Sequence, residues 1–306
     1  MCYNNPATPG AGFTRLVQRQ SKMILITGAT GTVGSEVVKR LSAQGIRVRA
    51  VTRNPRKAAA NRLPRVEFVP GDFDDSHSMR RACAGVDRAF LLTDSTDRAE
   101  RQQIAFTNVA RKCGVKHVVK LSQLHADAKS PGRFLRYHAS VEAAIQASGL
   151  SFTFLRPNLY MQGLLNFRQS IMQHSAFFVA AGEARISAVD VRDLADIAVA
   201  ALTTPLHDNK TYSLTGPAAL TFTQMAHQLS KATGRTVTFT DVPPATMRAA
   251  LVDLGMPAWQ ADGLLEEFEM YRRGESAGVE PGVQEALGRA PRSFAEFARD
   301  YAPQFA

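Results

Sequence analysis

Three glycines at a spacing of three residues, Gly28, Gly31 and Gly34, follow the apolar run 23–26 and open an amphipathic helical pattern. Gly28 can take backbone angles that a Cβ forbids, Gly31 lets the main chain approach a diphosphate, and Gly34 lets helix and strand pack closely. The N–H groups and the positive dipole end of the helix attract anions. The spacing therefore predicts a dinucleotide site, against the alternative of a purely structural turn. Its expected members are Thr27, Gly28, Thr30, Gly31, Thr32, Val33 and Gly34.

A basic residue stands where a dinucleotide site usually has an acidic one. The next strand, expected over 46–52, ends at Arg53, and no Asp or Glu lies between Gly45 and Asn61. NAD-binding units place a carboxylate there for the ribose hydroxyls. A guanidinium can instead hold a 2′-phosphate through two parallel hydrogen bonds, so the pattern predicts NADP(H) in preference to NAD(H), read by Arg53. The other cations of this stretch are equally consistent with a solvated basic surface; they are Arg47, Arg49, Arg56 and Lys57.

Composition narrows the class of protein. The 306 residues carry a net charge of +10, but the cations are spread along the chain without a helix-turn-helix or zinc pattern, which argues against nucleic acid. No apolar run approaches the length of a membrane span. Three cysteines, Cys2, Cys83 and Cys113, have no metal-ligand spacing, so we expect a cytoplasmic protein without a metal.

The elements that must position these residues alternate at short intervals. Strands are expected at 23–26, 46–52, 66–69, 88–92, 115–121 and 151–155, with helices at about 33–41, 58–61, 74–83, 98–113 and 134–148. Such alternation is typical of an α/β fold with a doubly wound parallel sheet, the Rossmann arrangement. We expect residues 23–157 to form the NADP-binding domain, with room for later strands to rejoin its sheet. Residues 1–22 lack periodicity and are expected to be a disordered or non-native extension.

From Asn158 the rhythm changes, and residues 158–306 are expected to form a smaller substrate-binding subdomain. Its expected helices are 159–173, a helix capped by Asp190 that ends near Leu202, and 221–233, with helical segments over 243–273. Its expected strands are 184–189, 211–214 and 236–240.

Several segments together resemble the NmrA-like branch of the atypical short-chain dehydrogenases, over about residues 23–300. They are Thr27–Gly34, Gly71-Asp72-Phe73, Ser148–Asn158 and Asp190–Ile197, with Tyr212–Pro217 and Thr221–Ala226 behind them. The loop Ser122–Asp127 and the helix start His138–Glu142 are similar to the NAD(P)H-dependent quinone oxidoreductases of that branch. The resemblance implies a doubly wound sheet with NADP(H) in the crevice at its carboxyl edge. It also implies that Asp72 and Phe73 flank the adenine, Asp72 being otherwise a turn carboxylate, and that Leu92 and Thr93 pass under the cofactor.

The chain departs from the usual short-chain dehydrogenase chemistry. That chemistry commonly needs a Ser, a Tyr and a Lys four positions after the Tyr, but Val141 follows Tyr137 and Leu164 follows Tyr160 at this spacing. Many NmrA-like proteins have a lysine where this chain has His138, one turn before Glu142. A tyrosinate base for alcohol oxidation is therefore not expected.

Reduction of a quinone needs fewer catalytic groups than alcohol oxidation, since the acceptor is already electrophilic and needs only hydrogen-bond donors and a proton. His138, with an ordinary pKa of about 6.5, is the candidate proton donor, against a packed or capping histidine. Ser122 and His125 are candidate donors, against plain loop positions, and Tyr137 is expected to pack or face solvent. An apolar set, either a flat aromatic pocket or core, is Leu159, Met161, Leu164 and Leu165.

The leading hypothesis is hydride transfer from NADPH to a quinone-like or electron-poor aromatic acceptor. A second hypothesis is a non-catalytic, redox-sensing NAD(P)-binding regulator that acts through protein partners, and a third is reduction or isomerisation of a sugar-linked or lipid substrate. The missing Tyr–Lys pair suits the first two, which steady-state turnover separates.

Overall fold

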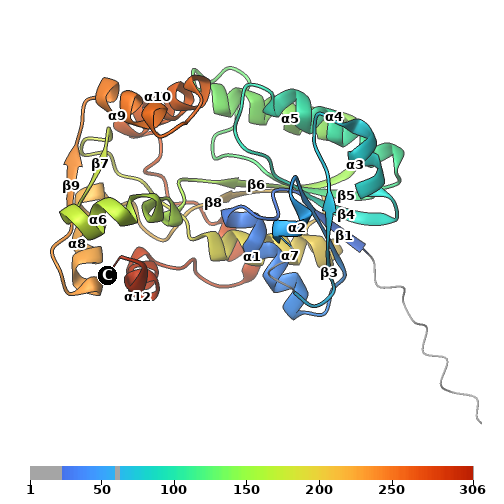
Figure 1. Cartoon of the computed structure of the whole chain (residues 1–306), viewed down its shortest axis with the longest axis horizontal. Coiled ribbons are helices and arrows are strands. Elements are labelled where there is room, and N and C mark those ends of the chain that lie inside the picture. Colours follow the sequence, from blue (N-terminus) through green and yellow to red (C-terminus); the bar gives the residue numbers. More distant parts are fainter. Residues whose placement is uncertain (1–22, 59–62, 306) are drawn as a thin grey trace, which may run out of the picture.

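The architecture is an α/β fold around a seven-stranded parallel sheet, seen here in a computed structural model that describes residues 23–58 and 63–305 (Figure 1). The strand order is β3-β2-β1-β4-β5-β6-β8, which confirms the predicted doubly wound sheet. The strands are β1 (Met23–Ile26), β2 (Val48–Thr52), β3 (Val66–Pro70), β4 (Val86–Leu91), β5 (His117–Leu121), β6 (Ser151–Pro157) and β8 (Lys210–Leu214). The expected extension 1–22 and most of the expected helix 58–61 lie outside the described residues.

Helices cover both faces of this sheet. One face carries α3 (Ser76–Cys83), α4 (Ala99–Lys112) and α5 (Arg133–Ala147), and the other carries α1 (Thr32–Ala43) and α7 (Val191–Thr203) (Figure 1). Short helices are α2 (Pro55–Ala58) and α11 (Gly282–Leu287). Asp190 caps α7, as the sequence predicted, and Asp75 caps α3, because the carboxylate of each accepts a backbone N–H group of the first turn.

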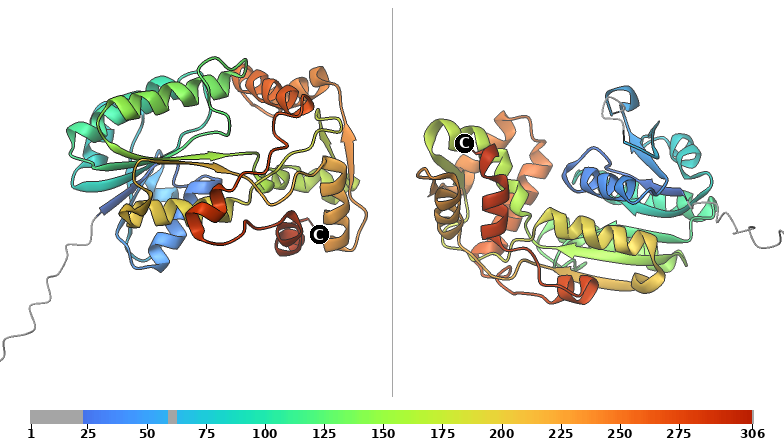
Figure 2. Two further views of the ribbon diagram at one scale, coloured as in Figure 1. Left: turned by 180° about the vertical axis from the view of Figure 1, so that it is seen from behind. Right: turned by 90° about the horizontal axis from the view of Figure 1, so that it is seen from below.

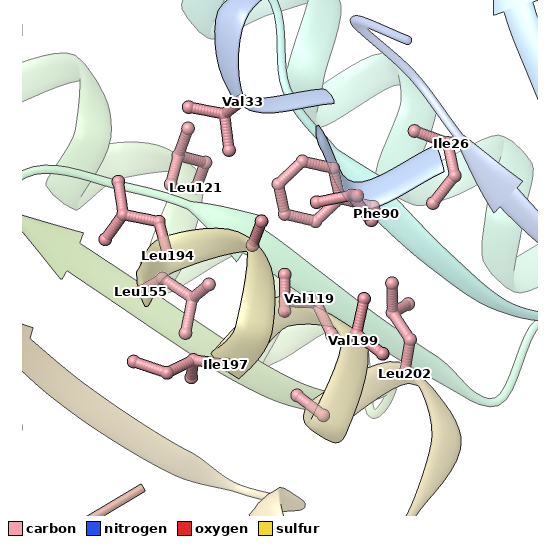
Figure 3. Packing of buried hydrophobic residues seen from close by; sticks show 14 of the residues in the cluster. Ile26, Val33, Phe90, Val119, Leu121, Leu155, Leu194, Ile197, Val199 and Leu202 are labelled. Atoms are coloured by element: carbon pink, nitrogen blue, oxygen red, sulfur yellow. The ribbon is translucent and has the colours of Figure 1, made fainter. Parts of the chain in front are cut away.

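The core between α7 and the sheet is apolar and closely packed. Leu194 and Ile197 of α7 lie over Leu155 of β6, and Val199 lies near Val119 of β5 (Figure 3). Successive residues of β5 face opposite sides, as in any strand, so Val119 packs on the α7 side and Val118 on the α5 side. The central strands are thus buried on both faces, which explains their continuous apolar runs.

A second lobe lies beyond the carboxyl ends of the strands, as the views from behind and below show (Figure 2). It contains a short parallel pair, β7 (Ala176–Val179) and β9 (Thr238–Asp241), and the helical segments η1 (Met161–Phe167), α6 (Arg168–His174), α8 (Phe222–Thr233), α9 (Pro244–Asp253), α10 (Ala258–Arg272) and α12 (Phe294–Tyr301). The strand β8 and helix α7, from the same half of the chain, return to the large sheet.

The predicted strand 184–189 is wrong. This segment forms only isolated bridges, Ile186 with Leu220 and Val189 with Tyr160, because its N–H groups bond to three different segments rather than to one partner strand. The helix α12 was not predicted, although Ser293 and Glu296 form a capping box at its start.

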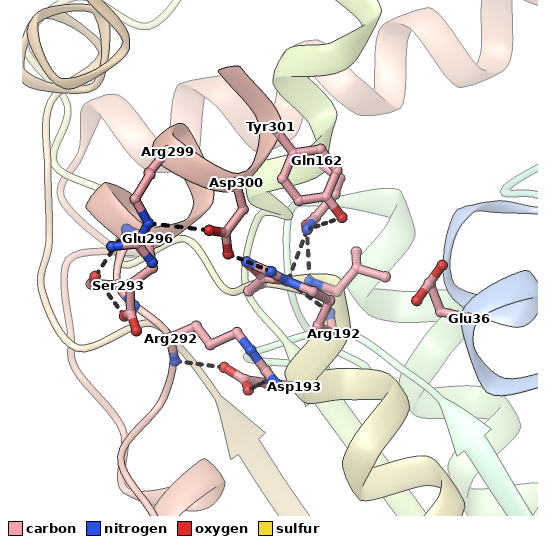
Figure 4. A network of polar contacts seen from close by, with 12 residues as sticks. Glu36, Gln162, Arg192, Asp193, Arg292, Ser293, Glu296, Arg299, Asp300 and Tyr301 are labelled. Atoms are coloured by element: carbon pink, nitrogen blue, oxygen red, sulfur yellow. Dashed lines mark hydrogen bonds and ion pairs between the residues drawn. The ribbon is translucent and has the colours of Figure 1, made fainter. Parts of the chain in front are cut away.

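Carboxylates at the start of α7 hold the carboxyl-terminal segment against the large sheet. Asp193 is fully buried and accepts hydrogen bonds from the side chains of Arg289 and Arg292 and from the backbone N–H of Arg292 (Figure 4). Arg192 bridges Asp190 and Asp300 of α12. The segment Asp190–Ile197, which carries part of the family resemblance, therefore acts here as a structural clamp.

Candidate cofactor and substrate cleft

One cleft follows the carboxyl edge of the large sheet, where the strand order reverses between β1 and β4. Its cavity volume is about 1020 Å³, and its lining runs from Gly31 and Arg53 at one end to Ser122, His138 and Gln260 of α10 at the other. Ligands of doubly wound sheets bind at this topological switch point. The structure thus brings most of the predicted site residues into a single depression.

The glycine corner is built for an anion. Gly28 has φ +60°, and Gly31 is the N-cap of α1 without any side-chain cap, so the N–H groups of the first turn stay available. A Cβ on Gly34 would lie 2.1 Å from the Gly28 carbonyl oxygen, which shows how closely α1 crosses β1. Thr30, Gly31 and Thr32 are exposed toward the cleft, and the first turn of α1 has no acidic residue. A dinucleotide diphosphate fits this donor set.

Thr27 supports the corner from below rather than lining the cleft. Its hydroxyl donates to the carbonyl oxygens of Phe90 and Leu92 and accepts from the Leu92 N–H at 2.9 Å, so it fixes the end of β4 beside the glycine turn. Leu92 in turn lies against Gly28 and lines the cleft together with Thr93. The side chain of Thr93 accepts a hydrogen bond from Gln103.

The adenosine end combines Arg53 after β2 with Asp72 and Phe73 after β3. Arg53 is exposed and lines the cleft. Asp72 also lines it, but its carboxylate accepts the Asp74 N–H at 2.9 Å, so the turn interpretation of this residue also holds. Phe73 packs edge-on against Phe106 at 5.8 Å and presents an aromatic wall.

Three neighbouring arginines do not contribute to this end of the cleft. Arg49 is held by Glu67 and by the carbonyl oxygens of Ala82 and Ala84, and Arg47 precedes β2 at the opposite edge of the sheet. Arg56 is exposed outside the lining residues. Among the cations of this stretch whose side chains the structure describes, which do not include Lys57, Arg53 is therefore the one that the cleft presents to a ligand.

At the other end, Ser122 and Glu142 belong to a closed polar group. The Ser122 hydroxyl donates to the Glu142 carboxylate at 2.5 Å, and Arg156 of β6 donates to both oxygens of the same carboxylate. Ser122 and Glu142 are buried. Because its proton is committed to Glu142, Ser122 can accept a hydrogen bond from a ligand but is not arranged to donate one.

The structure changes the chemistry expected of His138. Its ring is buried at the cleft wall, and burial, with the nearby cations Lys120 and Arg156, holds its pKa well below the ordinary value. His138 therefore stays neutral near pH 7, and the expectation that it exchanges protons with an ordinary pKa is wrong. The Nδ1 atom contacts Nζ of Lys120 at 2.7 Å.

Lys120 was missed by the sequence analysis. It lies in β5 and is fully buried, and burial lowers its pKa to about 7, with Glu142 acting to raise it and Arg156 to lower it. The signal was available, since a single charge within the apolar run Val118–Leu121 breaks the rule that lysines avoid cores.

Two tyrosines line the same end. Tyr137 is buried, packs against the His138 ring with centroids 4.1 Å apart and an interplanar angle of 33°, and forms a hydrogen bond with Ser95. Burial raises the pKa of Tyr137 and of Tyr160, so both keep their protons near neutrality. Of the two expectations for Tyr137, packing or facing solvent, its burial and ring contacts support packing, and the residue also lines the cleft.

Other candidates lie elsewhere. His125 is exposed, has φ +60° and borders a separate recess of about 20 Å³ beside Glu267, away from the residues that line the cleft. The apolar set of the second lobe packs in its core rather than along the cleft, which favours the core interpretation; its members are Leu159, Met161, Leu164 and Leu165.

No group of His, Cys, Asp and Glu side chains within residues 23–58 and 63–305 could hold a metal ion. In the same part of the chain, no helix has both the length and the apolar character that crossing a membrane requires.

Comparison with known proteins agrees with this geometry. A model of the NmrA-like family matches residues 20–298. The chain is 35% identical to an NAD(P)H azoreductase of Xenophilus azovorans over 92% of this chain and 99% of the relative. It is 36% identical to a (4-alkanoyl-5-oxo-2,5-dihydrofuran-3-yl)methyl phosphate reductase of Streptomyces griseus, over 93% of this chain and 99% of the relative. Among solved structures, an NADPH-dependent quinone oxidoreductase of Escherichia coli complexed with NADPH superposes with a TM-score of 0.79 at 29% identity, covering 91% and 99% of the two chains.

Proposed function

Because the chain belongs to the NmrA-like family, we propose that it is an NADPH-dependent reductase that transfers hydride to a quinone or another uncharged, electron-poor aromatic acceptor. The observation that carries the proposal is the single cleft that joins the anion-binding corner at Gly31 to the buried polar residues around His138. Relatives named as an azoreductase and a quinone oxidoreductase support reduction of such acceptors.

The preference for NADPH is proposed from the charge at the end of β2. Arg53 is exposed there within the lining of the cleft, and the segment from Gly45 to Pro55 contains no acid. A guanidinium at this position favours a 2′-phosphate, whereas NAD-binding sites usually need a carboxylate for the free ribose hydroxyls.

An uncharged acceptor is proposed because of the side chains that line the end of the cleft near His138. Tyr137, Tyr160 and Gln260 offer ring faces and amide groups there. Arg98, a further cation of the lining, is paired with Asp74 at 2.5 Å. A phosphate or carboxylate on the acceptor would therefore find no unpaired cation among the described residues that line this end of the cleft.

When bound, NADPH supplies the hydride, and the chain supplies placement and a proton. The Ser122 oxygen can accept a hydrogen bond from an N–H or O–H group of a bound ligand or of the reduced product, since Glu142 takes its proton. The tyrosines remain hydrogen-bond donors and cannot serve as bases near neutrality, because burial raises their pKa. The neutral ring of His138 faces the cleft as the donor best placed to meet charge that develops on the acceptor.

The test is consumption of NADPH by the purified protein with a panel of benzoquinones, naphthoquinones and azo dyes, followed by the loss of NADPH absorbance. Steady multiple turnover with at least one class supports the proposal. Tight binding of NADPH without turnover across the panel contradicts it and favours the redox-sensing regulator.

A further inference from the structure

Lys120 is a buried cation that the binding of cofactor and acceptor leaves unused. It lies on the face of β5 that packs against α5, and its Nζ donates to the Leu121 carbonyl oxygen at 3.2 Å as well as to Nδ1 of His138 at 2.7 Å. Its side chain has no exposed surface. Burying an unpaired ammonium group costs several kcal/mol, so the presence of a lysine at this buried position needs an explanation.

The neighbouring charged groups do not explain the burial of Lys120. On α5, Glu142 is occupied by Ser122 and by two N–H groups of Arg156, which lies on β6. Within the described part of the chain, no carboxylate forms an ion pair with Lys120, and its side-chain partner is the imidazole of His138. The remaining titratable neighbour is Tyr137, whose ring packs against that imidazole at a tilt and which keeps its proton.

This contact fixes the tautomer of His138. An ammonium group can only donate, so Nδ1 of the neutral imidazole must accept. The ring proton then resides on Nε2, which bonds to no other described residue, on a side chain that lines the cleft. In this tautomer, Nδ1 of the neutral imidazole accepts from the buried ammonium of Lys120, and the Nε2–H group is left to donate toward the acceptor site.

We propose that Lys120 and His138 form a two-residue proton relay for the reductase, which rests on the proposed function. As the reduced acceptor gains negative charge on its oxygen or nitrogen, Nε2 of His138 gives up its proton to that atom. Nδ1 takes a proton from Nζ of Lys120 in the same movement, so His138 remains neutral throughout. Lys120 is left as an amine and His138 with its proton on Nδ1. After the product leaves, Nε2 takes a proton from solvent in the cleft and Nδ1 returns its proton to Nζ of Lys120, which restores the starting state. The acceptor thus receives one hydride and one proton, and no further reactant is needed.

His138 is the catalytic residue in this scheme, because it borders the cleft, and Lys120 is a positioning and proton-storing residue that acts through it. The burial that lowers the pKa of Lys120 to about 7 makes its ammonium a ready proton donor at neutral pH. The arrangement also explains how a histidine that resists protonation can still deliver a proton.

The first experiment reads the tautomer in the free protein, without any turnover. Side-chain ¹⁵N NMR of the wild type, with His138 assigned through H138Q, should show a neutral Nε2–H ring from about pH 5 to 9. The Nδ1 shift should change with a midpoint near the pKa of Lys120 and lose that change in K120M. An imidazolium within this range, an Nδ1–H tautomer, or an unaltered Nδ1 titration in K120M overturns the relay.

The second experiment uses kinetics. The kcat of the wild type should fall as pH rises through about 7, because the ammonium is lost. K120M should lack this pH-dependent decrease, and its kcat should be about 10- to 100-fold lower than that of the wild type with little change in KM. H138Q, which keeps hydrogen bonds on both sides but cannot pass a proton, should lose at least as much.

The matched control is K116M, which removes an exposed lysine that precedes the same strand and pairs only loosely with Asp87. It should leave the pH profile unchanged. Wild-type kcat in K120M or H138Q overturns the relay. A wild type that binds NADPH but turns over no acceptor contradicts the proposed function instead, and the NMR result then decides the relay alone.

Discussion

Nζ of Lys120 and Nδ1 of His138 are 2.7 Å apart in the wall of the cleft, and this contact joins a strand of the sheet to the helix that covers it. A buried ammonium opposite an imidazole is a poor way to stabilise a fold, because the imidazole offers no opposite charge for the desolvated cation. We therefore expect stability and activity to respond in opposite directions when this contact is removed.

K120M should fold at least as stably as the wild type, with a gain in the free energy of unfolding of up to about 3 kcal/mol at pH 7. Lys120 has a folded pKa of about 7, below its ordinary value of 10.5, so the unfolded chain binds more protons between these values and wild-type stability rises with pH there. The advantage of K120M should therefore shrink from pH 7 to pH 10. Urea unfolding of both proteins at the two pH values measures it. A K120M protein that is less stable than the wild type by more than about 2 kcal/mol would show that Lys120 is a net structural support.

R53A should lose the preference for NADPH. Removing a charge-assisted contact with the 2′-phosphate costs about 1.5–3 kcal/mol, so the Kd for NADPH should rise about 10- to 100-fold while that for NADH stays the same. Calorimetric titration with both cofactors gives the ratio. R47A, which alters an exposed arginine at the opposite end of β2, is the control and should change neither Kd. An unchanged ratio in R53A would place the recognition of the phosphate elsewhere.

Two glycine variants should separate binding from folding. In G34A the added methyl group would lie 2.1 Å from the Gly28 carbonyl oxygen, so α1 must move away from β1 and both stability and NADPH binding should fall. In G31A the nearest atom is 3.4 Å away, so the fold should persist while the methyl group obstructs the diphosphate. Thermal unfolding and NADPH titration of both variants test this. A G31A protein with wild-type affinity would argue against a diphosphate at this corner.

How far the sequence could predict the site is clear at particular residues. The glycine spacing, Arg53 and the Asp190 cap depend on local rules of turn, charge and helix start, and the structure places them as those rules require. The burial of His138 against Lys120 depends on which face of β5 meets which face of α5, a relationship between residues distant in the chain that no local pattern encodes.

The segment 184–189 is a second case in which a local sequence pattern could not predict tertiary contacts. Its alternation is that of a strand, yet its hydrogen bonds go to Leu220, Ser276 and Leu159, three partners that only the tertiary structure brings together. Local periodicity predicted the extended backbone correctly and the pairing wrongly.

D193N should destabilise the protein by about 2–4 kcal/mol. Asp193 is fully buried and accepts hydrogen bonds from the partly exposed side chains of Arg289 and Arg292, so a neutral amide removes several charge-assisted hydrogen bonds and leaves both guanidinium groups with Asp196 alone. D300N is the control, since that carboxylate is about one-third exposed and its pairs should be worth less than about 1 kcal/mol. Chemical denaturation compares them. Equal costs in the two variants would mean that burial of Asp193 adds nothing to the clamp.

The return of β8 to the edge of the sheet, beside β6, has a consequence for how this chain is made. Until Leu214 has left the ribosome, β6 offers an open row of backbone N–H and C=O groups, and the apolar surface that α7 covers faces water. The amino-terminal half of the nascent chain is therefore prone to aggregate during most of its synthesis. Its folding depends on contacts between residues far apart in sequence. We expect a chain stopped after Pro157 to aggregate rather than to fold, because the amino-terminal half depends on β8 and α7 to complete its sheet and core.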